Sequence, residues 1–303
     1  MEQQHMFTNR MIRNLLVPVV LEQILNSIMG TADTMMVSNV GSAALSAVSL
    51  VDSINVLLIQ AFSALAAGGA IVCAQYIGQR NYEKANMSAR QVLFIITAIS
   101  VVVSAVCLIF QKPLLRLIFG AVDADVMRAS ETYFFFTALS FPFIAAYDSA
   151  ASIFRAQENT KGPMTISMIS NIMNIGGNAV LIWVFHLGVA GAAISTLVSR
   201  IFCAVVVLWQ LRKDRQPVVV RDYLKIRPDW SMIGRILGLG IPSGIENSMF
   251  QLGKLAIQST VSTLGTAAIA AQAMTNILEN LNGIAAIGVG VGLMTIVGQC
   301  LGA

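Results

Sequence analysis

One carboxylate lies deep in an apolar segment near the N-terminus. Asp33 sits in the stretch GTADTMMV, residues 30–37. An ionisable group in hydrocarbon costs several kcal/mol unless it is paired, hydrated or neutralised, so it is a functional candidate by default. A buried carboxyl group favours its protonated form, and its oxygens could also help to bind a hard cation such as Na⁺. The alternative is a carboxylate near the outer helix end that simply reaches water.

A second polar group consists of asparagines. Asn171, Asn174 and Asn178 lie in one apolar segment, and a Gly-Gly pair at 176–177 stands between the last two. Asn174 and Asn178 are one helical turn apart and share a face. Glycine lets a neighbouring helix approach closely. These amides either form hydrogen bonds between helices or supply oxygen ligands or a proton relay near Asp33.

Residues 15–79 and 239–303 are the same segment written twice, at an offset of 224 residues, the distance from Pro18 to Pro242. Glu22 and Glu246 also correspond, four residues after each proline. Proline frees a backbone carbonyl and bends a helix. A bend beside a carboxylate suits a moving or substrate-lining helix, unless both carboxylates simply lie near water at the cytoplasmic mouth. Lys254 lies about two turns after Glu246, which predicts a structural ion pair.

Further candidate substrate-lining residues follow from the same repeat. Asp52 and Asn55 in the first copy correspond to Asn276 and Glu279 in the second. Both pairs are predicted to face a wet interior. Asp148, beside Tyr147, is another inward-facing candidate.

The elements that must position these residues are long apolar helices. Hydrophobic residues make up 56% of the 303 residues and charged residues 11%, whereas soluble domains carry about 25% charged residues. A spanning helix needs about 20 mostly apolar residues. The sequence predicts an all-α polytopic membrane protein with eight spans, at residues 12–38, 44–77, 87–111, 130–156, 162–186, 188–211, 231–262 and 266–298, and an interfacial amphipathic segment at 112–129.

Lysine and arginine predict the topology. They gather in the N-terminal segment, in the loops after the second and fourth spans, and in the polar stretch 212–230. The N-terminus and these loops are therefore expected in the cytoplasm. The small net charge of +4 reflects this placement and gives no reason to expect nucleic acid as a partner.

The repeat also predicts the domain organisation. Residues 1–211 would form a complete six-helix lobe, 212–230 a cytoplasmic linker, and 231–303 the first two helices of a second, pseudo-symmetric lobe. Six helices return the chain to the same side, so the lobes would be parallel repeats. Because more than a hundred residues follow the first copy but none follow the second, we expect a chain truncated after its eighth helix.

An enzyme is not indicated. The two histidines, His5 and His186, lie far apart, and neither a metal-spaced cluster nor a nucleophile motif is present. The four cysteines are scattered through apolar stretches and are predicted to be buried thiols. We expect no metal and no cofactor.

Several motifs in this order resemble the multidrug and toxic compound extrusion (MATE) transporters. They are VPVVLE (17–22), ADTMMVSNVG (32–41), AQYIGQR (74–80), FRAQENTKGPM (154–164), GVAGAAIST (188–196) and GIPSGIEN (240–247). The resemblance covers essentially the whole chain. It implies twelve helices in two lobes, of which this chain would supply eight. It further implies a monomer in the bacterial inner membrane that exports drug-like, often cationic compounds in exchange for H⁺ or Na⁺.

The resemblance also assigns residues. In the bacterial branch it implies a cation site in the first lobe made by Asp33, Asn174 and Thr196, and a proline bend at Pro18. The family pattern has an aspartate one turn after the asparagine, where this chain has Asn178. The lost charge weakens a sodium site and favours proton coupling through Asp33. The alternatives are a lipid or polysaccharide-precursor flippase of the same superfamily, or a transporter remnant without activity.

Overall fold

The computed structural model describes residues 8–119, 123–213, 216–220, 227–262 and 266–303; most side chains between 255 and 281 lie outside the described set. All regular secondary structure in these ranges is helical, which confirms the all-α class. The elements are α1 (Asn9–Ser38), α2 (Ser42–Gly78), α3 (Tyr82–Ile109), α4 (Gln111–Phe119), α5 (Ala124–Leu139), α6 (Phe141–Ala156), α7 (Lys161–Ala179), the π-helix η1 (Val180–Val184), α8 (Gly188–Leu211), α9 (Trp230–Ser262) and α10 (Thr266–Gly302).

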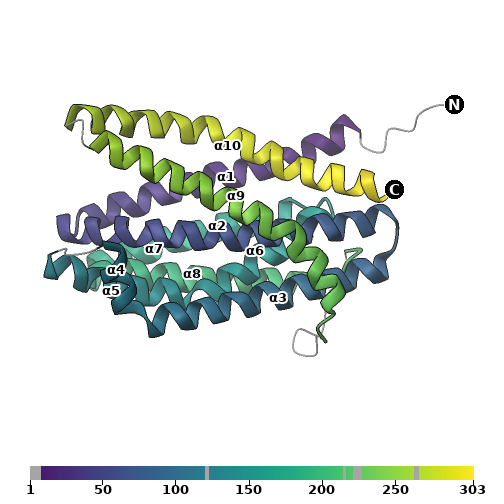
Figure 1. Cartoon of the computed structure of the whole chain (residues 1–303), viewed down its shortest axis with the longest axis horizontal. Coiled ribbons are helices and arrows are strands. Elements are labelled where there is room, and N and C mark those ends of the chain that lie inside the picture. Colours follow the sequence, from purple (N-terminus) through teal and green to yellow (C-terminus); the bar gives the residue numbers. More distant parts are fainter. Residues whose placement is uncertain (1–7, 120–122, 214–215, 221–226, 263–265) are drawn as a thin grey trace.

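The long helices run back and forth along the long axis of the molecule and pack in layers (Figure 1). α2 is central: it packs against α3, α5 and α6 on one side and against α9 and α10 on the other. α1 contacts both α7 and α10. We call the end of the bundle that holds the N-terminus, the α2–α3 and α6–α7 connections and the start of α9 the basic end, because most of the basic loops lie there.

Six helices in the described part of the chain are long and apolar enough to cross a membrane, or seven if one bent pair counts as a single span. That pair corrects the predicted continuous helix at 130–156. It consists of α5 and α6, which meet at Ser140 with a bend of 42°. Pro142 stands in the first turn of α6, where its missing N–H costs least and where the preceding helix cannot easily continue.

Three further predictions change in detail. α9 was expected to span, but it is not among the six qualifying helices. The expected helix at 162–186 passes into the π-turn η1 at Val180. The amphipathic segment predicted at 112–129 is the short α4 followed by the start of α5. Leu115 of α4 is buried and Leu117 is exposed, as an interfacial helix requires.

The two copies of the repeat pack against each other reciprocally. A Cβ atom at Gly68 of α2 would meet Gly240 of α9, and one at Gly292 of α10 would meet Leu16 of α1. The repeat offset of 224 residues separates Gly68 from Gly292, and it also separates Leu16 from Gly240. Near the basic end Gly78 faces Gln299, and Gly302 faces Gln75. In a two-fold arrangement, if position i of one copy contacts position j of the other, then position j of the first copy contacts position i of the second. The contacts between the two copies follow this rule.

These close approaches predict a measurable penalty for added bulk. A methyl group in Gly68→Ala would lie 2.6 Å from the backbone nitrogen of Gly240. Overpacking of this kind costs about 1–3 kcal/mol, so the thermal unfolding midpoint in detergent should fall by several degrees. Gly238→Ala is the matched control, because nothing lies within 4 Å of its Cβ and alanine favours a helix. Equal midpoints for the two variants would contradict the packing.

Candidate functional site

The four residues predicted to form a cation site come together between α1, α7 and α8. The Asn178 amide donates to Asp33 Oδ1 at 2.6 Å and to Asn174 Oδ1 at 3.3 Å. Asn174 in turn donates to Thr196 Oγ1 at 3.3 Å. The Thr196 hydroxyl donates to the Ala192 carbonyl at 3.0 Å. Asp33 therefore begins a continuous chain of hydrogen bonds across three helices.

Small residues make this convergence possible. Gly177 of α7 leaves no room for a Cβ against the Ser195 hydroxyl of α8, so the two helices touch. Ser195 uses that proximity to donate to the Asn174 carbonyl at 2.8 Å. The sequence predicted that the Gly-Gly pair would let a neighbouring helix approach closely. Gly177 does so, and it brings the face of α7 that carries the asparagines against α8.

One atom of the site is left open. Among the residues that the structure describes, Asn178 Oδ1 is buried and has no hydrogen-bond partner. A buried amide oxygen without a partner costs about 1–3 kcal/mol. Such an acceptor beside a carboxylate is suited to a proton-bearing group or a cation.

A second carboxylate lies near the first. Asp52 Oδ1 accepts from Asn55 at 3.2 Å and from the Tyr133 hydroxyl at 3.3 Å. The charges of Asp52 and Arg200 both act on Asp33. The Arg200 guanidinium also donates to Ser140 Oγ at 2.7 Å, at the α5–α6 bend. Arg200 thus balances part of the negative charge inside the helix bundle.

A buried ion pair near the basic end was not predicted from the sequence. Glu22 of α1 is 2% exposed, and both its oxygens accept from Arg155 of α6 at 3.0 Å. The Tyr147 hydroxyl donates to the same carboxylate at 3.1 Å. Asp148, the neighbouring candidate, is half-buried and lies within electrostatic reach of Arg155 and Arg200. Glu22 is therefore buried in an ion pair that joins α1 to α6.

The repeat-related residues behave differently. Glu246 is exposed, and the predicted Glu246–Lys254 ion pair is wrong. The Lys254 ammonium contacts Glu279 Oε1 of α10 at 2.7 Å instead, since a partner on the facing helix is nearer than one two turns away. The side chain of Asn276 lies outside the described residues. Pro18 is buried inside α1, and Pro242 is exposed inside α9.

Two cavities lie between the first six spans and the second hairpin. One of about 310 Å³ is lined by Asp52 and Ser53 of α2 and Gln251 of α9. Another of about 140 Å³ lies nearer the basic end and is lined by Gln60, Arg155 and Asn247. Thr295 of α10 also lines this cavity, and its hydroxyl donates to the Arg155 carbonyl at 3.2 Å; one turn further on, Gln299 donates to the Ala156 carbonyl at 2.9 Å. These two bonds close the crevice at the basic end.

A bundle of apolar helices with a duplicated hairpin and sheltered ionisable groups has the architecture of a membrane transporter. The MatE family model matches residues 18–180 and 242–303. The chain belongs to this family.

Individual relatives agree. The probable multidrug resistance protein YoeA of Bacillus subtilis is 28% identical over 297 residues, which is 95% of this chain and 63% of YoeA. The probable multidrug resistance protein NorM of Thermotoga maritima is 25% identical over 94% of this chain and 61% of its own length. The chain thus spans less than two thirds of these relatives.

Solved structures agree on the fold. A MATE protein crystallised in the bent conformation superimposes with a TM-score of 0.88 at 21% identity, covering 97% of this chain and 65% of that one. An outward-facing MATE transporter of the MOP superfamily gives 0.89 at 20% identity, again covering 97% and 65%.

Proposed function

We propose that this protein is a secondary antiporter that exports drug-like, often cationic compounds in exchange for protons bound at Asp33. The observation that carries the proposal is the Asp33–Asn178–Asn174–Thr196 chain inside the first six spans. Relatives named as multidrug resistance proteins support the substrate class. The coupling role of Asp33 rests on its chemistry and its place in the bundle.

The identity of residue 178 favours protons over sodium. The Asn178 amide donates to Asp33 Oδ1, which suits an ionised Asp33, and after a flip it can accept from a protonated one. The unpartnered Asn178 Oδ1 is the acceptor that this flip requires. A sodium site needs several oxygen ligands and gains from a second carboxylate, and Asn178 supplies no charge. Asn178 therefore fits both protonation states of its neighbour.

α1 is the element that can transmit the change. It carries Asp33, contains Pro18 and packs on both α7 and α10. Protonation removes the charge that holds Asp33 to the Asn178 amide, which lets α1 bend at Pro18, where the missing N–H leaves the helix one backbone hydrogen bond short. A bend would shift α1 against α10 and compress the crevice between the lobes. The proton shifts the equilibrium between the straight and bent forms of α1, because Asp33 binds it more tightly in one form than in the other.

Transport of a fluorescent lipophilic cation in proteoliposomes tests this function. Protein inserted into vesicles preloaded with ethidium should move it against its gradient when a pH gradient is imposed, and a sodium gradient of equal size should have at most a small effect. A proton ionophore should abolish the movement. Transport that survives the ionophore but follows sodium would contradict proton coupling, and no transport in either gradient would contradict antiport by this chain.

A second carboxylate at position 178, as in the family pattern, should give the site affinity for sodium. Asn178→Asp places two carboxylates around the site, so sodium should stabilise the variant against thermal unfolding by RT ln(1 + [Na⁺]/Kd), an amount that grows with the sodium concentration. Asn171→Asp is the matched control, because Asn171 lies on the same helix but donates to Asn26 at 3.1 Å. We expect sodium-dependent stabilisation only in Asn178→Asp. The same response in both variants, or in neither, would contradict the assigned geometry.

A further inference from the structure

The polar linker is pinned to the first lobe by side-chain amides. Gln91 of α3 donates to the Arg227 carbonyl at 2.7 Å and accepts from the Asp229 N–H at 3.2 Å. Asn86 accepts from Val219 N–H at 2.7 Å. Asp229 then caps α9 by accepting from the Ser231 and Met232 backbone N–H groups. The start of α9 is thus held beside the first turns of α3.

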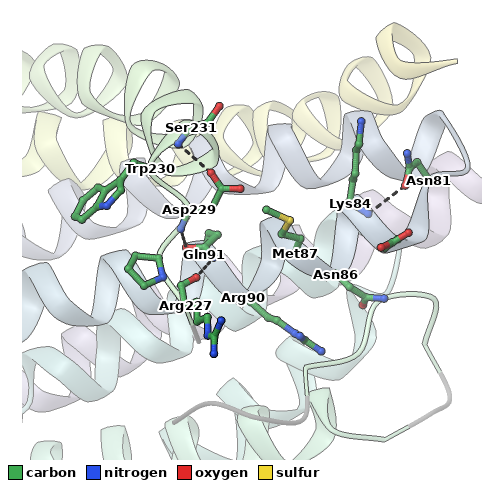
Figure 2. Close-up of a pocket in the computed structure, with 12 residues that line it drawn as sticks. Asn81, Lys84, Asn86, Met87, Arg90, Gln91, Arg227, Asp229, Trp230 and Ser231 are labelled. Atoms are coloured by element: carbon green, nitrogen blue, oxygen red, sulfur yellow. Dashed lines mark hydrogen bonds between the residues drawn. The ribbon is translucent and has the colours of Figure 1, made fainter. Parts of the chain in front are cut away.

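This arrangement creates a groove at the basic end. It has a volume of about 1160 Å³ and lies between residues 81–91 of α3 and residues 227–231. Arg90 and Arg227 both extend on the side of the groove away from α9 (Figure 2). In the described part of the chain neither these arginines nor Lys84 forms an ion pair. Two anionic residues also line the groove: Asp229, which is already engaged as the helix cap, and Glu83 in the first turn of α3.

Aromatic side chains place the groove at the level of the membrane surface. Trp230, in the groove wall, is 73% exposed, and Trp209 at the end of α8 is 58% exposed. Lys213 lies 3.5 Å above the Trp209 ring. Exposed tryptophans beside basic residues are typical of the boundary between headgroups and hydrocarbon. A ligand in this groove would therefore sit at headgroup depth.

An apolar stripe continues from the groove toward the hydrocarbon. Met87 lines the groove and is exposed, and Val101 and Ile109 are exposed further along α3. Met87, Phe94 and Val101 are seven residues apart and therefore share one helix face. A two-tailed lipid with its headgroup in the groove would lay its acyl chains along this stripe.

We propose that the groove binds the headgroup of an anionic phospholipid, with the phosphate held between the guanidinium groups of Arg90 and Arg227. Arginine suits this task because its planar donors match phosphate oxygens. One wall is the beginning of α3 and the other is the segment 227–231 that leads into α9. The bound lipid therefore joins α3 to the segment that enters α9 and stabilises that contact.

Trp230 provides a local reporter for the test. A Trp183→Phe/Trp209→Phe background leaves it as the only tryptophan. In vesicles of dioleoylphosphatidylcholine, brominated phosphatidylglycerol should quench Trp230 fluorescence more strongly than brominated phosphatidylcholine at equal mole fraction. Each basic residue near an anionic headgroup is worth a factor of about five in affinity, so the loss of both in Arg90→Gln/Arg227→Gln should lower the preference by about twenty-five-fold.

Controls separate a site from general charge and from a free anion. Arg10→Gln/Arg13→Gln removes two exposed charges from the same end of the bundle and should leave the preference unchanged. Arg90→Lys/Arg227→Lys should retain part of it, which shows that the protein is folded. Equal quenching by both lipids, or equal losses in both glutamine variants, would overturn the proposal. Displacement of the brominated lipid by millimolar inorganic phosphate would overturn the lipid as occupant and leave a free-phosphate site.

Discussion

Asp33→Asn should reduce proton-driven export to the background of vesicles without protein. Asparagine has nearly the same shape as aspartate but cannot bind or release a proton, so the variant is fixed in a neutral form at every pH. The neutral amide should also lose the charge-assisted bond from Asn178, which is about twice as strong as a neutral one. Transport of ethidium down its own gradient should persist, because the cavities lined by α2 and α9 are unchanged.

The matched control is Asp125→Asn. Asp125 is exposed and pairs only with Arg128 on its own helix at 2.9 Å. It should transport at the wild-type rate. If Asp33→Asn retains more than about half of the wild-type proton-driven rate while its expression is normal, the ion does not act through Asp33.

Loss of one partner of the Glu22–Arg155 pair should cause the largest change in stability. Removing one member of a buried pair leaves an uncompensated charge and costs about 3–5 kcal/mol. Glu22→Gln and Arg155→Met should therefore each unfold at a much lower temperature in detergent. The double variant should lose less than the sum of the single ones, because it leaves no unpaired charge. Circular dichroism during heating measures all three.

An exposed pair calibrates the result. Arg128→Met breaks the surface pair with Asp125, whose side chains are 77% and 79% exposed, and should change stability by about 0–1 kcal/mol at most. Single variants of the buried pair that cost no more than Arg128→Met would show that Glu22 and Arg155 do not hold α1 to α6.

Asp33, Asn174 and Asn178 could be selected from the sequence because their clues are local, and the structure brings them together. A carboxylate inside an apolar run stands out, and the spacing of Asn174 and Asn178 puts them on one face whatever the tertiary fold. The duplicated segment likewise predicted which hairpins correspond, and the reciprocal contacts of Gly68 and Gly292 agree with it.

The Glu22–Arg155 pair was missed for the opposite reason. The two residues are 133 positions apart, and no periodicity links them. Arg155 lies next to a basic loop, so the topology rule assigned its charge to the cytoplasm, although its neighbours Phe154 and Ala156 are buried. An apolar residue on each side of the arginine was the one available signal.

The repeat also led us to expect the same surroundings for residues at equivalent positions, and this was wrong for the two glutamates. Glu22 and Glu246 occupy equivalent positions, yet one is buried in an ion pair and the other is exposed. The partner that decides this, Arg155, lies outside the repeated segment. Likewise, the bend at Ser140 lies beside Pro142 and accepts a hydrogen bond from Arg200, a contact between distant parts of the chain that hydropathy does not predict.

Proton release on substrate binding tests the central claim most directly. If substrate and proton favour opposite states, adding tetraphenylphosphonium to purified protein in weak buffer must release protons, since linkage between two ligands is reciprocal. We predict a release of up to one proton per protein near neutral pH, and none from Asp33→Asn. Equal release from the wild type and from Asp33→Asn would contradict the account, as would no release from a wild-type protein that binds the cation.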